Sequence, residues 1–534
     1  MEKLKDFAKE TNQPIFEINN DELISLSPYL DEENDSYKAP DDWFDKYDLS
    51  LDGFSGFPFI NPSEEEKEEI IKKFLNGIQK LLNPESNWTF YKPFFLSLKH
   101  CVKCNTCAEA CHIYVGSGKK EIYRPNFRSE VLRRIYKRYF TISGKVLKSF
   151  VGADIEVTYS LIRRLLELAY RCTLCRRCAL YCPVGIDNGL IARELRKLFS
   201  QELGMAPVEV YKKGTRLHLQ TGSTTGMKPH TFIDVIKFIE EDIHEKTGKK
   251  ITIPVDKKGA DIMLLHNGGE YLSWPDHIAA FAILFDAAGI NYTLSSETLG
   301  YDGVNYGAWY DDVELARVGL RHLQIAHELG VKKLVIGECG HSHKVYSVIF
   351  DRILPASSPL WNIQRESCLP LMWEIVRSGV VKLDPMRNNF PITFHDSCNI
   401  VRLMGIVSPQ RKIIKAISPG TFREMKPNGT YNYCCGGGSG FAIIRSLNFP
   451  VFRNKVSLRL KTKQILDTFS DVLNQDIPKV VVATCSNCKG SLRDIMKIYE
   501  LFHKYKINYS GLADLIVNAI TDIPPFLNLE EMEE

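Results

Sequence analysis

The sequence lacks a strong charge of either sign. Its 68 Lys and Arg residues nearly balance 65 Asp and Glu residues, which leaves a formal net charge of +3 over 534 residues. This charge is too small to indicate a nucleic-acid partner. The sequence also lacks a long apolar run, because the longest one, residues 278–290, contains Asp286 and is shorter than the roughly 20 residues that span a bilayer. We therefore predict no nucleic-acid binding and no membrane-spanning helix.

Targeting signals and a dinucleotide-binding motif are also missing. The first residues, MEKLKDFAKETNQ, have no apolar core after the early lysines, so neither a secretory signal nor a twin-arginine leader is predicted. No G-x-G-x-x-G motif follows a predicted strand. We expect a cytoplasmic chain without a nucleotide-binding fingerprint of its own.

Cysteine, in contrast, is abundant. The chain has fifteen cysteines, and only Cys339 and Cys368 stand outside three spaced groups. In a chain without an export signal, a reducing compartment keeps thiols available for metals or catalysis rather than for disulfides. The length is also too great for one ordinary core and favours two or three packed units.

Two cysteine groups repeat the spacing C-x2-C-x2-C-x3-C. They are Cys101, Cys104, Cys107 and Cys111, and Cys172, Cys175, Cys178 and Cys182. This is the bacterial ferredoxin spacing, in which three close thiolates bind one [4Fe-4S] cluster and the fourth reaches the partner cluster. The predicted ligand sets are Cys101, Cys104 and Cys107 with Cys182, and Cys172, Cys175 and Cys178 with Cys111. Zinc is disfavoured, because a zinc site uses pairs of cysteines with the spacing C-x2-C and does not need a third cysteine after two further residues.

The segment between the two motifs has an irregular start and a basic helix. His112 stands where the motif usually has proline, which weakens the predicted turn more than the ligand assignment, and the spacing before His112 excludes a c-type haem. Residues 129–150 have helical apolar spacing, and two interpretations stay open for them: docking on a membrane partner or anionic headgroups, or a solvated face of a core helix. The side chains concerned are Arg133, Arg134, Lys137, Arg138, Lys145 and Lys148, with Tyr139, Phe140 and Phe150.

From about Gly259 the pattern changes to short apolar strands that alternate with amphipathic helices. The expected strands are residues 260–267, 332–338, 391–396 and 478–485, and the expected helices are residues 276–289, 311–330 and 486–505. This alternation predicts an open, mostly parallel α/β sheet. Ligands of such sheets lie at the carboxyl ends of strands, where Cys398 and Cys485 follow their predicted strands.

The third cysteine group supplies five thiolates, one more than a cubane needs. It consists of Cys398, Cys434, Cys435, Cys485 and Cys488, and three glycines follow the adjacent pair. Adjacent cysteines point to different sides of an extended backbone, which suits a larger iron-sulfur assembly better than one compact cube.

A weak internal repeat relates two segments of the α/β region. KKLVIGECGHSHK resembles PKVVVATCSNCKG, with Cys339 aligned to Cys485 and Ser342 in the place of Cys488. The first half therefore looks degenerate, and we expect one unusual cluster. Cys339 is a candidate to line that site, although a buried structural thiol is the default interpretation, which we also adopt for Cys368.

Three histidines lie close in sequence to these cysteines. A histidine near a thiol-reducing cluster can supply a proton, whereas a packed, hydrogen-bonded histidine is the common alternative. The three are His341, His343 and His395, of which we favour His341 and His395.

Together, these motifs resemble the heterodisulfide reductase type iron-sulfur subunits, over roughly residues 85–520. The resemblance rests on the two ferredoxin-type motifs followed by HDSC, CCGGG and CSNC, and on GECGH and RRIYKRYF. It implies two cubane [4Fe-4S] clusters and one noncubane [4Fe-4S] cluster, whose ligands carry over to Cys398, Cys434, Cys435, Cys485 and Cys488. The complete enzymes have two such Cys-Cys-Gly halves, each with a cluster, so the degenerate first half puts a double-cluster mechanism in doubt.

The sequence patterns and the extent of the resemblance together predict an organisation of domains. We expect an N-terminal extension at 1–84, a helical ferredoxin-like domain at 85–205, a linker at 206–258 and a pseudo-repeated α/β Cys-Cys-Gly domain at 259–534. Within the extension, Ser63 and Glu66 predict a helix that starts with a capping box.

The resemblance implies a catalytic subunit that exchanges electrons between two partners. One is an integral membrane cytochrome b-type subunit that interacts with quinone, and the other is a protein or small-molecule disulfide or trisulfide. Other iron-sulfur or cytochrome c subunits are expected in the same complex, which would attach the chain peripherally to the inner face of the membrane. Two alternatives stay open: a pure electron relay, and the iron-sulfur subunit of a glycolate or glycerol-3-phosphate dehydrogenase.

Overall fold

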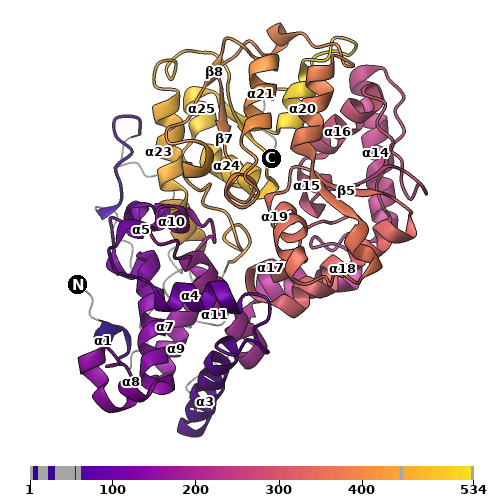
Figure 1. Ribbon diagram of the computed structural model, residues 1–534. Coiled ribbons are helices and arrows are strands. Elements are labelled where there is room, and N and C mark those ends of the chain that lie inside the picture. Colours follow the sequence, from indigo (N-terminus) through magenta and orange to yellow (C-terminus); the bar gives the residue numbers. More distant parts are fainter. Residues whose placement is uncertain (1–3, 10–21, 31–53, 56–61, 446–448, 531–534) are drawn as a thin grey trace. The chain divides into compact units, whose positions relative to one another are not determined.

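The computed structural model describes residues 4–9, 22–30, 54–55, 62–445 and 449–530 (Figure 1). The chain divides into two compact units. The first contains residues 1–212, 309–312 and 436–461, and the second contains residues 213–308, 313–435 and 462–534. The predicted domain boundaries stay a prediction, but the segment at 206–258 contains a 19-residue helix, α14 (Pro229–Thr247), with an apolar buried side.

The first unit is built of helices. They are α1 (Leu4–Phe7), α3 (Glu64–Leu81), α4 (Tyr91–Lys99), α5 (Thr106–Glu109), α6 (His112–Gly116), α7 (Pro125–Phe140), α8 (Ile142–Leu147), α9 (Tyr159–Tyr170), α10 (Arg177–Leu180), α11 (Asn188–Leu203), α12 (Val208–Val210) and α22 (Phe449–Phe452). In Figure 1, α7, α9 and α11 pack together as the body of this unit. The only strands of its described part, β1 (Phe54–Ser55) and β2 (Ala206–Pro207), pair antiparallel.

The long helix α3 confirms the predicted capping box. The Ser63 side chain accepts a hydrogen bond from the Glu66 amide, and the Glu66 carboxylate accepts one from the Ser63 amide. These two bonds satisfy amides that a helix start otherwise leaves without partners. The buried side of α3 packs against α11, so part of the predicted extension belongs to the helical core. The sequence also has an acidic segment at residues 31–48, DEENDSYKAPDDWFDKYD, which lies outside the described residues.

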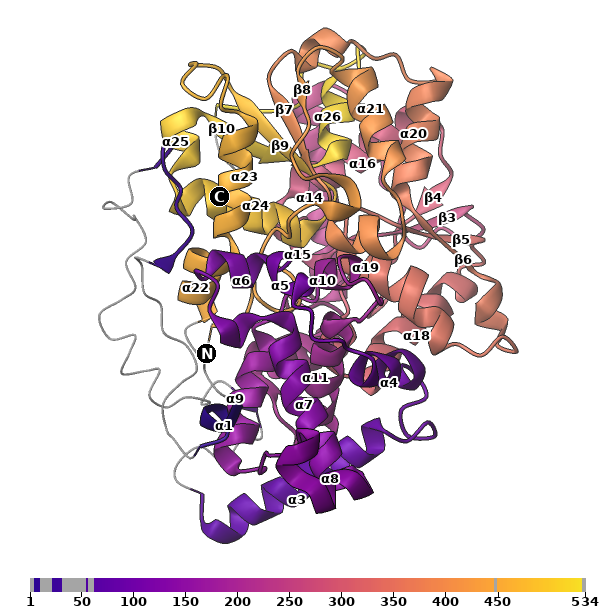
Figure 2. The ribbon, with the colours of Figure 1, turned by 60° about the vertical axis from the view of Figure 1, so that its left-hand side comes forward.

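The second unit contains two four-stranded sheets in which all pairs are parallel (Figure 2). Their strands are β3 (Ile262–Leu265), β4 (Tyr292–Thr293), β5 (Lys333–Ile336) and β6 (Gln364–Ser367), and β7 (Ile392–His395), β8 (Phe422–Arg423), β9 (Lys479–Ala483) and β10 (Ile507–Ser510). The helices are α13 (Leu217–Thr221), α14, α15 (Gly268–Ser273), α16 (Pro275–Ala287), α18 (Asp312–Glu328), α19 (Gly340–Lys344), α20 (Cys368–Ser378), α21 (Ser408–Ile417), α24 (Ser486–Ile498), α25 (Leu501–Tyr505) and α26 (Leu512–Asn518). Two more helices, α17 (Gly307–Tyr310) and α23 (Arg459–Thr468), contain positions where the chain passes between the units, and α18 does so after its first residue, Asp312.

The two sheets have the same topology, which supports the predicted internal repeat. The first has the strand order β4-β3-β5-β6, and the second, read from its other edge, has the order β8-β7-β9-β10. The strand before Cys339, β5, therefore corresponds to β9, the strand before Cys485. The predicted α/β architecture with parallel strands is confirmed, with two sheets of four strands.

The apolar run that looked too short for a membrane is a buried helix. Within α16 every residue from His277 to Phe285 is buried, and α16 packs against α14 and α26. Burying a side chain of the size of Ile or Phe contributes roughly 1.5–3 kcal/mol. Across the described residues, every helix is too short or too polar to cross a bilayer.

Candidate metal centres

Both C-x2-C-x2-C-x3-C motifs adopt the same backbone conformation in the first unit. Lys103 and Asn105 have φ angles of 60° and 63°, and Leu174 and Arg176, at the matching positions of the second motif, have 52° and 60°. Left-handed backbone is uncommon for residues that carry a side chain, and it persists where the surrounding structure requires it. Each loop leads into a short helix, α5 or α10, that contains the third cysteine of its motif. The two loops therefore present their thiols in the same way.

The fourth cysteine of each motif lies near thiols of the other motif. Burial raises the pKa of Cys111 to about 12, and the neighbouring Cys175 and Cys172 add to this increase. Burial also raises the pKa of Cys107 to about 12, with a smaller contribution from Cys182. The structure thus places Cys111 near Cys172 and Cys175, and Cys182 near Cys107, and the crossed ligand sets stay a prediction.

This donor set fits iron-sulfur clusters. Besides Cys107 and Cys111, burial raises the pKa of Cys178 well above its ordinary value. Thiolates this close together and this buried repel one another unless a positive charge compensates them, and cluster iron supplies that charge. Thiolates are also the usual ligands of such clusters.

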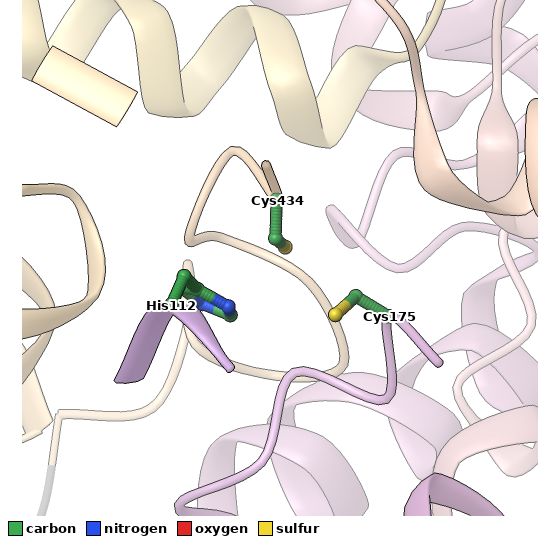
Figure 3. Close-up of side chains that lie close together, drawn as sticks. All are labelled: His112, Cys175 and Cys434. Atoms are coloured by element: carbon green, nitrogen blue, oxygen red, sulfur yellow. The ribbon is translucent and has the colours of Figure 1, made fainter. Parts of the chain in front are cut away.

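A histidine of the first unit lies beside these thiols (Figure 3). A ring nitrogen of His112 and the Sγ of Cys175 lie within 4.8 Å of each other. The His112 ring is buried, and its Nε2 is 3.3 Å from the Ser457 Oγ. Figure 3 also labels Cys434, which belongs to the second unit. The sequence signal for His112 was its place directly after Cys111, where proline is usual.

A buried arginine holds the second motif against the glycine segment that follows Cys434 and Cys435. Arg196 of α11 donates hydrogen bonds to the carbonyl oxygens of Ala169 at 3.0 Å, Cys172 at 2.5 Å and Ser439 at 3.1 Å. Nearby, a Cβ on Gly438 would lie 3.0 Å from the carbonyl oxygen of Thr173, a distance that favours glycine. No motif in the sequence pointed to Arg196.

In the second unit, two predicted cluster cysteines lie at the carboxyl edge of one sheet. Strands β7 and β9 are adjacent and parallel, and His395 pairs in register with Ala483. Cys398 follows β7, and Cys485 follows β9. Parallel strands place their carboxyl ends at the same edge, which is the usual position of a ligand site.

Three of the predicted side chains converge in a buried group. A ring nitrogen of His395 and the sulfurs of Cys435 and Cys488 all lie within 4.8 Å of one another. A hydrogen bond between the Cys485 and Cys488 side chains lowers the pKa of Cys485. Hydrogen bonds with Cys435 and then Cys485 raise the pKa of Cys488. Cys434 is buried next to Cys435 in the chain, and Cys398 is half-buried. The buried thiols and the histidine are suitable donors for a metal cluster.

The degenerate half of the repeat, which contains Cys339, lies next to the thiol group around Cys485. A Cβ on Gly340 would lie 2.9 Å from the Cys485 Sγ, so the residue after Cys339 approaches this thiol closely. The Ser342 hydroxyl lies 3.2 Å from the Cys339 Sγ, at the position where the repeat has its second cysteine. Burial, followed by the proximity of Cys485, raises the pKa of Cys339 to about 12. Cys339 therefore lies beside the thiol group, whereas Cys368 is a buried thiol at the start of α20.

The two histidines that follow Cys339 are buried and hydrogen-bonded. Burial lowers the pKa of His341 to about 3 and that of His343 to about 4, so both rings are neutral near pH 7. The Nδ1 of His341 contacts the Asn487 side-chain amide, and His343 bonds to the Ser367 hydroxyl at 2.8 Å.

The buried aspartate of the HDSC motif is fixed by an ion pair with a partly buried arginine. Arg411 donates hydrogen bonds of 2.8 and 2.7 Å to the two carboxylate oxygens of Asp396, and it also pairs with Glu424. The Gly429 amide donates a further bond to Asp396 at 2.6 Å. These bonds anchor the turn that leads from β7 to Cys398.

A buried group of charges, which sequence reasoning missed, flanks the cysteine loops. Lys489, next to Cys488, pairs with Glu270 at 3.3 Å. His277 bonds to Asp514 at 2.8 Å and lies 3.7 Å from the carboxylate of Glu338, the residue before Cys339. Lys489, His277 and Asp514 line a cavity of about 510 Å³ in this unit. The available signal was position, because the acid of GECGH and the lysine of CSNCK adjoin the cysteines.

We expect the stability of the protein to fall as the pH rises from about 4.5 through neutral pH. Burial alone would lower the pKa of His277, but the Asp514 and Glu338 carboxylates outweigh it and raise this pKa above 6.5. The protonated ring therefore stabilises the folded state at low pH, and this contribution is lost as the pH passes the raised pKa. Burial raises the pKa of Glu338 to about 7, which acts in the same direction between pH 4.5 and about 7.

The measurement is the free energy of unfolding under anaerobic conditions across this pH range. His277→Gln should flatten the slope above pH 6.5, whereas the control His503→Gln, at an exposed site, should leave it unchanged. An equal slope in the wild type and His277→Gln would contradict the expectation.

Comparison with known families assigns both cysteine regions. Residues 97–186 match the 4Fe-4S dicluster domain family, and residues 392–493 match the cysteine-rich domain family. The first range contains both ferredoxin-type motifs, and the second contains the five thiols of the third group. Both matches indicate that the chain carries iron-sulfur clusters.

Similar proteins agree with these domains. The Hdr-like menaquinol oxidoreductase iron-sulfur subunit 2 of Archaeoglobus fulgidus is 28% identical over 65% of this chain and 68% of its own length. The Hdr-like menaquinol oxidoreductase iron-sulfur subunit of Archaeoglobus profundus is 26% identical over 71% of each chain. The dihydromethanophenazine:CoB–CoM heterodisulfide reductase of Methanosarcina acetivorans has a subunit that is 24% identical over 75% of this chain and 89% of its own length. The resemblance expected from the motifs is confirmed, and an oxidoreductase role is supported.

Proposed function

We propose that this chain exchanges electrons with a disulfide. The premise is that it joins a 4Fe-4S dicluster domain to a cysteine-rich domain of the heterodisulfide reductase type. The other redox partner is a quinone-interacting cytochrome b subunit. One observation carries the proposal: Cys435, Cys488 and His395 converge within 4.8 Å, and the Cys485 and Cys488 side chains are hydrogen-bonded.

The proposal assigns three clusters. Two cubane [4Fe-4S] clusters take the ligand sets Cys101, Cys104, Cys107 and Cys182, and Cys172, Cys175, Cys178 and Cys111. The third is a noncubane [4Fe-4S] cluster on Cys398, Cys434, Cys435, Cys485 and Cys488. The proximity of Cys111 to Cys172 and Cys175 supports the crossed sets. The five thiols, more than a cubane uses, support the third assignment.

The glycine segment that follows Cys435 packs against the second motif within the first unit. Gly438 packs against Thr173, between Cys172 and Cys175, and it stands only three positions after Cys435 in the chain. Three residues extend over at most about 11 Å. The Arg196 hydrogen bonds to Cys172 and Ser439 fix this connection. Such a short link supports electron transfer between the two sites.

The residues around the third site suit thiol-disulfide chemistry. Reduction of a disulfide consumes two electrons and two protons, breaks the S–S bond and yields two thiols. When bound, the iron-sulfur clusters supply the electrons one at a time. His395, within 4.8 Å of the Cys435 and Cys488 sulfurs, is positioned to hold a proton for a departing thiolate. Cys339 lines the site beside Cys485, and His341 orients the Asn487 side chain.

The partners follow from what the similar proteins are named for. One is named a menaquinol oxidoreductase subunit, and another belongs to a CoB–CoM heterodisulfide reductase. We propose an integral membrane cytochrome b-type partner, together with other iron-sulfur or cytochrome c subunits. These subunits would attach the chain peripherally to the cytoplasmic face of the membrane.

A thiol titration followed by electron paramagnetic resonance tests the proposal. Adding a dithiol to the oxidised, anaerobically purified chain is expected to produce a new signal from the third site, because substrate sulfur meets the thiols around Cys435. Adding the matching thioether is the control and should change nothing. If the dithiol leaves the spectrum unchanged, the chain is a pure electron relay. Purification with a flavoprotein instead of a cytochrome b would favour the glycolate or glycerol-3-phosphate dehydrogenase alternative.

A further inference from the structure

One end of the first unit carries an exposed apolar tip that has no part in the proposed redox function. We define the tip as α8 and the following 3₁₀ turn, residues 142–151. Ile142 is 85% exposed, Val146 72% and Phe150 93%, and Leu147 is also exposed. Single exposed apolar residues are ordinary, but four within nine positions form a patch that usually marks an interaction surface.

The charge around the tip has one sign. Lys145 and Lys148 stand among the apolar residues, and residues 141–153 contain no acidic residue. Within the described part of the chain, neither lysine forms an ion pair, and both are exposed. The neighbouring helix differs, because Arg134 pairs with Asp154 at 2.6 Å and Arg133 pairs with Glu130. The cationic surface therefore belongs to the tip and not to α7 as a whole.

The tip is held in a defined conformation. Thr141 accepts a hydrogen bond from the Gly144 amide at 3.1 Å and donates one to the Lys137 carbonyl at 2.7 Å. The Lys137 ammonium donates to the Val151 carbonyl at 2.9 Å, which closes the far end of the tip against α7. The apolar side chains are thus presented by ordered backbone at both ends.

We propose that this tip inserts into the headgroup region of an anionic lipid bilayer. Apolar side chains flanked by lysines suit the boundary between acyl chains and negatively charged headgroups, because the lysine stems extend toward the phosphates. Figures 1 and 2 both show α8 at the end of the first unit away from α5 and α10, the helices of the cysteine motifs. The unit contacts lipid at one end and carries its thiols at the other.

Vesicle co-sedimentation of the full chain tests this inference. The wild type is expected to bind vesicles of phosphatidylcholine with phosphatidylglycerol more strongly than vesicles of phosphatidylcholine alone. Ile142→Ser with Phe150→Ser should lower the bound fraction at least about tenfold, since two large apolar side chains no longer insert. Lys145→Glu with Lys148→Glu should remove the preference for the anionic lipid.

Met386→Ser, which replaces an apolar residue that is 68% exposed in the second unit, is the matched control and should bind as the wild type does. Equal vesicle binding by the wild type and the double serine variant would overturn the proposal. So would a wild-type chain that ignores vesicles and binds only a protein partner through the tip.

Discussion

Cys435→Ala is expected to remove the third cluster and leave the two ferredoxin-type clusters in place. The iron content should fall from about twelve to about eight atoms per chain, because the altered thiol belongs only to the five-thiol group. Disulfide turnover should fall at least about 1,000-fold, the scale expected when a catalytic unit loses a necessary member. The Cys435 sulfur lies within 4.8 Å of both Cys488 and His395, so its loss opens the centre of the group. Iron analysis, electron paramagnetic resonance and turnover measure these effects.

Cys368→Ala is the matched control. The Cys368 thiol is buried as fully as Cys435, but it lies at the start of α20 and outside the converging group. The control should keep about twelve irons and its turnover, with only a small loss of stability from the smaller side chain. Twelve irons and full turnover in Cys435→Ala would refute the assignment. The same loss in both variants would indicate a general effect of removing a buried thiol.

The strands of the second unit could be predicted from the sequence because their signals are local. Each expected strand is a short apolar run, and all four were found as β3, β5, β7 and β9. The helix expected at 486–505 is two helices, α24 and α25, since Glu500 between them has a positive φ of 53°. The short strands β4 and β8 have little apolar sequence of their own, so pairing with β3 and β7 defines them.

The cysteine spacing predicted the candidate thiol groups, and the structure brings Cys435 and Cys488 together with His395, while the ligand assignment stays a prediction. The same reasoning could not find the charges behind them. Glu338 and Lys489 lie next to cysteines, but His277 joins them from α16 only through the tertiary fold. The basic helix shows the opposite case: its charge was visible in the sequence, but its internal partners, Asp154 and Glu130, were not.

Arg196→Met is expected to be the most destabilising substitution outside the cysteines. The guanidinium is fully buried, lies 4.4 Å over the Tyr170 ring and donates to three carbonyl groups. Methionine fills similar apolar volume but leaves those carbonyls without their donor. Because each buried, unsatisfied polar group costs roughly 1–3 kcal/mol, the free energy of unfolding should fall by about 3–5 kcal/mol. Anaerobic chemical denaturation measures this loss.

The conservative variant separates charge from geometry. Arg196→Lys keeps a positive charge, but a lysine ammonium cannot reproduce the planar arrangement of the guanidinium donors that bond to the three carbonyl groups. Its free energy of unfolding should therefore lie between those of the wild type and Arg196→Met. Because Arg196 joins Cys172 to Ser439, both variants should also slow the reduction of the third site after the ferredoxin-type clusters are reduced. Rapid-freeze electron paramagnetic resonance follows that step. Stability equal to the wild type in Arg196→Met would mean that the three carbonyls find other donors, and the short link to the glycine segment would then not depend on this arginine.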